Sequence, residues 1–222
     1  MSVDIDILLP PEMLSAEQID ALGAVLIGSL AYSRSHENPC RLEKEVNQRI
    51  IELDLIVSLD PADPEEMITK LPGGKWKMDA AIAEGGPTVL NHLEVIEVRY
   101  EEDHAAKRVA LRIPDAVGFF ILKSAVTYHR EKSKDAYDIY YYCPFSDEPE
   151  DIRKKLRASL TENAVLAAIS RVKRIFEYPD SKWVEMVLDH LGIQGELERD
   201  REAQAIVGAV MAIVADLMPP AP

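Results

Sequence analysis

The first half of the sequence alternates short apolar runs with turn-forming residues, a pattern typical of strands joined by loops. Apolar and acidic positions alternate up to the break at Pro10, which predicts a strand with two different faces. Ser15 and Gln18 form a capping-box pattern that marks the beginning of a helix. The pattern predicts strands over 3–9 and 49–57, a hairpin over 93–100 and 108–113, a helix over 15–30, and a short acidic helix from Asp60 through Lys70.

After Pro114 the apolar residues recur every three or four positions, which is typical of helices. Asp115 is in place to cap the first of them. The pattern predicts helices over 116–129, 133–142, 148–176 with a break near Leu160, 181–191 and 196–217. The sequence therefore predicts an α/β first half and a helical second half.

Composition narrows the class of protein. The 222 residues are 47% hydrophobic and 29% charged, and 25 Lys and Arg against 39 Asp and Glu give a net charge of −14. So acidic a surface repels phosphate backbones and anionic lipid, which argues against duplex DNA and membranes as partners, although a local basic site could take a nucleotide or an RNA end. We expect no signal peptide, because Asp4 and Asp6 interrupt the apolar start. The two cysteines make no disulfide framework, and the longest apolar run, 207–218, is shorter than the ~20 residues of a membrane span. We expect a soluble, cytoplasmic protein.

Acidic residues sit at alternate positions of both early strands. Asp4 and Asp6 point to one side of the first strand, and Glu52 and Asp54 repeat the arrangement on the second. If the strands are neighbours, Asp54 can reach a cation held by Asp4 and Asp6, and three converging carboxylates suit Mg²⁺ and phosphoryl or nucleotidyl transfer. The alternative is that these residues form a solvated face of the sheet.

A row of cations follows the very apolar segment 117–126. Lys123, Arg130, Lys134 and Asp138 are spaced by seven, four and four residues, and Asp135 precedes Asp138 by three. This spacing places them on one side of a continuous helix, or on facing ends if the helix bends near Glu131. One alternative is an ordinary ion pair between Lys134 and Asp138. Lys123 has no acidic residue three or four positions away, so it needs a partner from outside its own helix.

Other chemistries find little support. The five histidines lack zinc spacing, no serine lies in a G-x-S-x-G motif, and no P-loop is present. We expect Trp76, Trp183 and the tyrosines at 140–142 to pack in the core, because no basic patch is interleaved with them. The C-terminal helix has an apolar face that is either a packing face or the surface of a homo-oligomer; it comprises Ile206, Val210, Ile213 and Leu217.

Three segments between Val3 and Tyr142 resemble the AbiEii toxin-like nucleotidyltransferases, a family of the DNA polymerase β-like nucleotidyltransferase superfamily. They are the D-x-D strand over 4–9, the I-E-L-D-L-I strand over 51–56, and the segment from Arg112 to Ile139. The last segment contains a lysine, an arginine and then K-D-x-x-D, and it is the most specific part of the resemblance.

The resemblance implies a small mixed sheet with flanking helices of nucleotidyltransferase type over 1–143 and a helical C-terminal region over 144–222. It implies transfer of a nucleoside monophosphate from an NTP, with Mg²⁺, to an acceptor that is RNA or a protein, and a cognate antitoxin as partner. The implied catalytic residues and metal ligands are Asp4, Asp6 and Asp54. The implied nucleotide- or substrate-binding residues are Lys123, Arg130, Lys134, Asp135 and Asp138. Both groups are expected to face one cleft.

The sequence departs from the family at its beginning. The family carries a Gly-Gly or Gly-Ser element before the D-x-D, and here only Met1, Ser2 and Val3 precede Asp4. Loss of backbone donors to the phosphates weakens NTP binding. Either the start was assigned downstream of the real one, or the chain is a shortened member of the family. The second case gives the alternative function, a catalytically inactive module of the same fold that binds a nucleotide, RNA or a protein partner.

Overall fold

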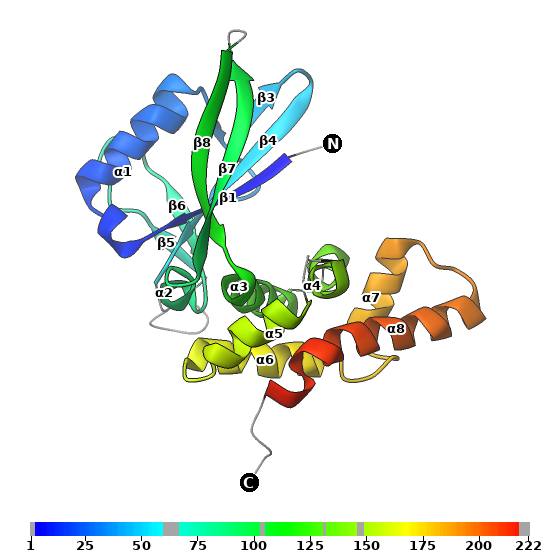
Figure 1. The fold of residues 1–222 in the computed structure, drawn as a ribbon. Helices are drawn as coiled ribbons and strands as arrows, with labels where there is room; N and C mark the ends of the chain where they lie inside the picture. Colours follow the sequence, from blue (N-terminus) through cyan, green and yellow to red (C-terminus); the bar gives the residue numbers. More distant parts are fainter. Residues whose placement is uncertain (1–2, 60–66, 103–104, 131, 146–148, 218–222) are drawn as a thin grey trace. The chain divides into compact units, whose positions relative to one another are not determined.

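The computed structural model describes residues 3–59, 67–102, 105–130, 132–145 and 149–217 (Figure 1). The chain divides into two compact units, Met1–Leu90 and Asn91–Pro222, and each is described by itself. Strands and helices are both present, so the fold is mixed α+β, as the sequence predicted. Residue 143, where we expected the first domain to end, lies within α4 (Ser133–Phe145) of the second unit.

The first unit is built on a mixed sheet of six described strands. Strand β4 is parallel to β1 and β6 and antiparallel to β3. In chain order the elements are β1 (Val3–Leu9), η1 (Pro11–Met13), α1 (Ala16–Gly23), the π-helix η2 (Ala24–Ser29), β2 (Ser33–Arg34), β3 (Arg41–Val46), β4 (Arg49–Val57), β5 (Ile68–Lys70), β6 (Asp79–Ile82) and α2 (Gly86–Val89).

The predicted strands β1 and β4 are confirmed, and so is the helix that Ser15 caps through the Gln18 N–H. The acidic helix expected through Lys70 is wrong at its end. Residues 68–70 form strand β5, antiparallel to β6, with Ile68 opposite Ala81. The β-branched pair Ile68–Thr69 favours a strand once a partner is available. The rest of that predicted helix, 60–66, lies outside the described residues.

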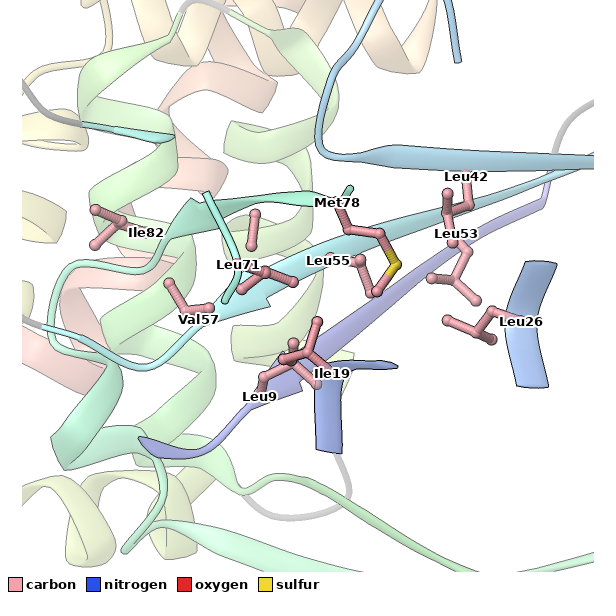
Figure 2. Close-up of a cluster of buried hydrophobic side chains, with 11 residues drawn as sticks. Leu9, Ile19, Leu26, Leu42, Leu53, Leu55, Val57, Leu71, Met78 and Ile82 are labelled. Atoms are coloured by element: carbon pink, nitrogen blue, oxygen red, sulfur yellow. The ribbon is translucent and has the colours of Figure 1, made fainter. Parts of the chain in front are cut away.

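The core of the first unit lies on one face of the sheet. Alternate residues of β4 are buried (Leu53, Leu55 and Val57), as expected for a strand whose side chains point to opposite faces in turn. Ile19 of α1 and Leu26 of η2 belong to the same cluster (Figure 2). Burying one large apolar side chain stabilises the fold by about 1.5–3 kcal/mol. The apolar residues therefore determine which face of the sheet packs in the core, and the polar residues take the other face.

A loop after β5 is tied to α1 through Trp76. The Asp20 carboxylate accepts the backbone N–H groups of Gly74, Lys75 and Trp76 at 3.3, 3.1 and 3.3 Å, and the bond from Gly74 is the largest cause of its lowered pKa. Gly23 lies against the indole: a Cβ there would be 2.4 Å from Cγ of Trp76. This helix surface therefore requires a residue without a side chain.

The second unit begins with a hairpin and continues as helices, as predicted. All ten residues of β7 pair with β8. The elements are β7 (Leu93–Glu102), β8 (Ala105–Pro114), α3 (Ala116–His129), α4 (Ser133–Phe145), α5 (Pro149–Ala158), α6 (Asn163–Ile175), α7 (Lys182–Leu191), α8 (Glu196–Val214) and η3 (Ala215–Leu217).

The helices of the second unit pack around their own core. Helix α3 contacts α6, and α4 contacts α7 and α8. Phe120 and Phe176 are its largest fully buried side chains. Asp115 caps α3 by accepting the N–H groups of Val117 and Gly118 at 2.8 and 3.1 Å. The apolar face of α8 is buried within this unit, which supports the packing alternative for that helix.

Candidate functional site

Five carboxylates share one side of the sheet in the first unit. We call this the acidic face and define it by Asp4, Asp6, Glu43, Glu52 and Asp54. Asp4 is opposite Glu52 and Asp6 is opposite Asp54 in the parallel pair β1–β4. Glu43 is opposite Glu52 in the antiparallel pair β3–β4. Paired residues point to the same side of a sheet, and the core takes the other side. The two acidic strands are therefore neighbours, which meets the condition set for convergence of their carboxylates.

Arg41, the first residue of β3, holds both carboxylates of β4. Its Nε and Nη2 donate to Oδ1 and Oδ2 of Asp54 at 2.7 and 2.8 Å, and its Nη1 donates to Oε2 of Glu52. The bonds to Asp54 are the main cause of the raised pKa of Arg41, and bidentate pairs of this kind are among the stronger hydrogen bonds in proteins. The side chains of Arg41, Glu52 and Asp54 are 25%, 19% and 24% exposed, so solvent and ions reach them.

Glu52 lies between Arg41 and Asp4. The pKa of Glu52 is raised, first because partial burial disfavours its charged form and second because it shares a hydrogen bond with Asp4; the charge of Arg41 acts in the opposite direction. The cation of Arg41 offsets part of the negative charge of the acidic face.

A divalent cation fits this site in chemistry and in register, but not in the arrangement observed. Asp4, Asp6 and Asp54 offer the hard oxygen ligands that Mg²⁺ prefers. Both oxygens of Asp54, however, already accept hydrogen bonds from Arg41. Within the described part of the chain, no group of three or more His, Cys, Asp or Glu side chains is arranged to hold a metal ion.

In the second unit, Lys123 of α3 connects to the two carboxylates of the K-D-x-x-D segment. Its Nζ lies 2.6 Å from Oδ2 of Asp138 and 3.5 Å from Oδ1 of Asp135. The prediction that Lys123 has a partner outside its own helix is confirmed, and α4 supplies that partner. Asp135 is 2% exposed. A buried carboxylate needs compensating charge, which explains why cations converge on it.

Arg130 binds the same buried carboxylate. Its Nε and Nη2 lie 2.8 and 3.2 Å from Oδ2 and Oδ1 of Asp135. The backbone of Arg130 is extended, so the chain leaves α3 here, and of the two alternatives the continuous helix is excluded. Lys123, Arg130, Asp135 and Asp138 together form what we call the α3–α4 cluster. Lys134 lies exposed in the first turn of α4.

The predicted site residues thus fall into two groups, the acidic face of the first unit and the α3–α4 cluster of the second. The register places the three predicted metal ligands on one face of the sheet. The helix pair brings four of the five predicted binding residues together. That the two groups meet at one cleft stays a prediction.

Sequence reasoning missed Arg41, although a signal for it exists. The turn between β3 and β4 has two residues, Asn47 and Gln48, because Val46 is opposite Arg49. Counting outward from such a turn places Arg41 opposite Asp54. A hairpin prediction for residues 41–57 would therefore have revealed the pair.

The sequence analysis also missed two contacts between a cationic side chain and an aromatic ring. Lys182 Nζ lies 4.6 Å from the ring centre of Trp183, whose Nε1 donates to the Thr127 carbonyl at 3.3 Å. Arg174 lies over the ring of Tyr128 at 5.5 Å and donates to its hydroxyl at 2.9 Å. These contacts join α3, α6 and α7, and only the packing of the three helices brings them together.

Comparisons with known proteins add no constraint. Searches against protein-family models, curated proteins and solved structures found no match to this chain. In the segments that the structure describes, no helix has both the length and the apolar character needed to span a membrane.

Proposed function

We propose that this chain is a nucleotidyltransferase that moves a nucleoside monophosphate from an NTP to an acceptor. The register of β1 and β4 carries the proposal, because it sets Asp6 beside Asp54 with Asp4 two residues away on the same face. Carboxylates this close repel one another without a cation. Sets of this kind serve phosphoryl and nucleotidyl transfer in two-metal enzymes.

In this proposal Asp4 and Asp6 are ligands of Mg²⁺, which neutralises developing charge on the phosphates when bound. Asp54 orients or deprotonates the attacking hydroxyl of the acceptor. Each Asp54 oxygen accepts one hydrogen bond from Arg41, which leaves a second lone pair on each oxygen for this role.

The α3–α4 cluster supplies the phosphate-binding groups of the proposal. Lys123 and Arg130 bind phosphate oxygens, and Lys134 adds a cation to the same region. Asp135 and Asp138 hold Lys123 and Arg130 in position through the ion pairs described above. The proposal includes an RNA or protein acceptor, a cognate antitoxin and a cytoplasmic location, following the family resemblance.

The test is transfer of label from each α-labelled NTP, with Mg²⁺, into total RNA and separately into a protein extract. We expect incorporation by the full chain and a loss of at least about a hundredfold in Asp4→Ala. Glu17→Gln is the matched control, because Glu17 is an exposed carboxylate of α1 in the same unit. Equal incorporation by wild type and Asp4→Ala would remove Asp4 from the mechanism.

One observation favours a second function, a catalytically inactive module that binds a nucleotide, RNA or protein. Arg41 already neutralises Asp54, so the acidic face is held together without a metal. Under this alternative, NTP binding in a calorimetric titration is independent of Mg²⁺ and unchanged in Asp4→Ala, and no label is transferred. The nucleotidyltransferase proposal instead requires binding that depends on both.

A further inference from the structure

The β7–β8 hairpin forms a two-stranded sheet of its own. Among the described strands β7 pairs with β8 alone, so both strands have an outer edge. Figure 1 shows the hairpin extending away from the helices of its unit, and the side chains from Ala105 to Arg112 are all exposed. Two strands alone are only marginally stable in water, whereas three or more strands with an apolar face are stable. The hairpin therefore gains stability from another strand at one of its edges.

One face of the hairpin is apolar and partly exposed. The register puts Ile96 opposite Leu111 and Val98 opposite Val109, with Tyr100 further along β7 on the same face. Tyr100, Val109 and Leu111 are 44%, 39% and 42% exposed. Aromatic and β-branched side chains on neighbouring strands stabilise a sheet through their mutual contact. A further strand with the same alternation would extend this apolar face.

The other face carries charges that are not balanced within the hairpin. Arg99 is directly opposite Arg108, and like charges in this position destabilise a sheet. Glu97 serves both of them, because its Oε1 lies 3.1 Å from Nη1 of Arg108 and 3.6 Å from Nε of Arg99. The side chains of Arg99 and Glu97 are 71% and 50% exposed. Arg99 is therefore accessible to a second carboxylate from outside the hairpin.

A second copy of β7 supplies that carboxylate. When two β7 strands pair antiparallel about a two-fold axis at Val98, Glu97 of each copy is opposite Arg99 of the other. The same register puts Ile96 opposite Tyr100 on the apolar face. An axis at Glu97 or at Arg99 would instead place like charges opposite each other. An axis between two residues would mix the apolar and charged faces.

The edge of β8 does not offer this complementarity. Strand β8 contains Lys107, Arg108 and Arg112 and no acidic residue, so two β8 strands side by side bring only positive charges together. Pro114 at its end also lacks a backbone N–H. Pairing β7 of one copy with β8 of the next would leave an edge open at each end and continue into a filament, whereas pairing about a two-fold axis closes at two copies.

We propose that this chain forms a two-fold homodimer through the outer edge of β7, in which two hairpins make one four-stranded sheet. The order of its strands is β8–β7–β7–β8. The self-complementary charges of β7 identify a second copy as the partner. This surface differs from the apolar face of α8, which is buried within its own unit. The dimer does not depend on the proposed catalytic function.

The test is sedimentation equilibrium of the full chain at concentrations up to about 100 μM, a range that covers weak as well as tight association. We expect wild type to have twice the mass of one chain. Arg99→Glu and Glu97→Arg each put two like-charge pairs across the axis and raise the dissociation constant at least about tenfold. Arg112→Glu is the matched control, because it makes the same charge change on an exposed arginine of β8. It should remain a dimer.

A mixture of the two charge variants separates loss of the interface from loss of the fold. Combining Arg99→Glu with Glu97→Arg in equal amounts restores opposite charges across the axis, so we expect a heterodimer to form from two chains that do not self-associate. Arg99→Glu also removes the like-charge pair with Arg108 and should leave the hairpin intact. Circular dichroism checks the fold of each variant. Hydrogen exchange should be slower for β7 peptides in the wild-type dimer than in Arg99→Glu.

Four results would overturn the inference. They are a monomeric wild type over the whole concentration range, assemblies larger than two copies, dimerisation of Arg99→Glu as tight as that of wild type, and failure of the mixed variants to associate. A wild-type dimer whose β7 peptides exchange as fast as those of Arg99→Glu would place the interface elsewhere and would also contradict it.

Discussion

Lys123 and Asp138 are fifteen residues apart in the sequence, and the lysine Nζ lies 2.6 Å from Oδ2 of the aspartate. The contact joins α3 to α4 beside Asp135, which is almost fully buried and lies 3.5 Å from the same nitrogen. The lysine therefore has a structural role that can be measured without any substrate.

We expect Lys123→Met to lower the free energy of unfolding of the second unit by about 1–3 kcal/mol, the cost of leaving charged groups without one partner. Hydrogen exchange of peptides from α3 and α4 in increasing urea measures this for the second unit alone. Lys132→Met, at an exposed lysine between the two helices, is the control and should change the value by less than about 0.5 kcal/mol. Equal losses in both variants would contradict a specific role for Lys123.

The close approach of Gly23 to Trp76 gives a second prediction. Gly23→Ala places a Cβ within 2.4 Å of the indole Cγ, next to the backbone, where the ring cannot move aside cheaply. We expect a loss of about 1–3 kcal/mol, as for other overpacked sites. Gly28→Ala is the matched control, because its Cβ would lie 3.5 Å from the same ring, an ordinary contact. Urea unfolding measures the free energy of unfolding of both variants. A Gly23→Ala chain as stable as Gly28→Ala would show that the indole ring is loosely held.

The β3–β4 turn gives a stabilising substitution. Asn47 and Gln48 both have positive φ, 52° and 63°, in a two-residue turn, the signature of a type I′ turn that prefers Asn-Gly. Asparagine tolerates this conformation, but glutamine does not favour it. We expect Gln48→Gly to raise the free energy of unfolding of the first unit by about 0.5–1 kcal/mol, and Gln48→Thr to lower it. Denaturant unfolding measures both, and destabilisation by glycine would refute the strain.

The two cysteines give a pH-dependent prediction. Burial raises the pKa of Cys40 to about 11 and that of Cys143 to about 12, whereas an unfolded thiol has a pKa of about 8.5. Both folded thiols are therefore neutral at pH 8, and the thiolate is the reactive form. Iodoacetamide labelling at pH 8, followed by peptide mass spectrometry, should modify each cysteine only as fast as its unit opens.

The sign of the linked stability effect follows from the same values. Between about pH 8.5 and the folded pKa values, unfolding releases the thiol protons, so the free energy of unfolding falls as the pH rises. Labelling in denaturant is the control for reagent activity. Fast labelling of native Cys143 at pH 8 would contradict the burial of that thiol.

Helices and strands are predicted well from the sequence where a regular pattern of apolar residues is bounded by a proline or a capping residue. Strand β1 stops before Pro10, and α3 begins after Asp115, whose side chain caps it. The prediction fails at Ile68, where the tertiary partner β6 decides between helix and strand. Local patterns carry no information about such a partner.

In the candidate site, too, local patterns predicted some features and tertiary contacts decided the others. Alternation put Asp4 and Asp6 on one side of a strand, and the missing acidic neighbour of Lys123 indicated a partner elsewhere. The identity of that partner, Asp138, depends on how the chain turns between α3 and α4, and Arg41 depends on hairpin register. Non-local geometry of this kind lies outside the reach of spacing rules.

Strand β1 is bonded to β4 alone among the described strands, so it borders its sheet. Such a border can recruit a strand from another molecule and start a fibril, and Ile5 is 42% exposed there. Asp4 and Asp6 give this strand charges that repel a second copy of itself. Two copies of this strand placed side by side would bring their aspartates together, which disfavours such pairing.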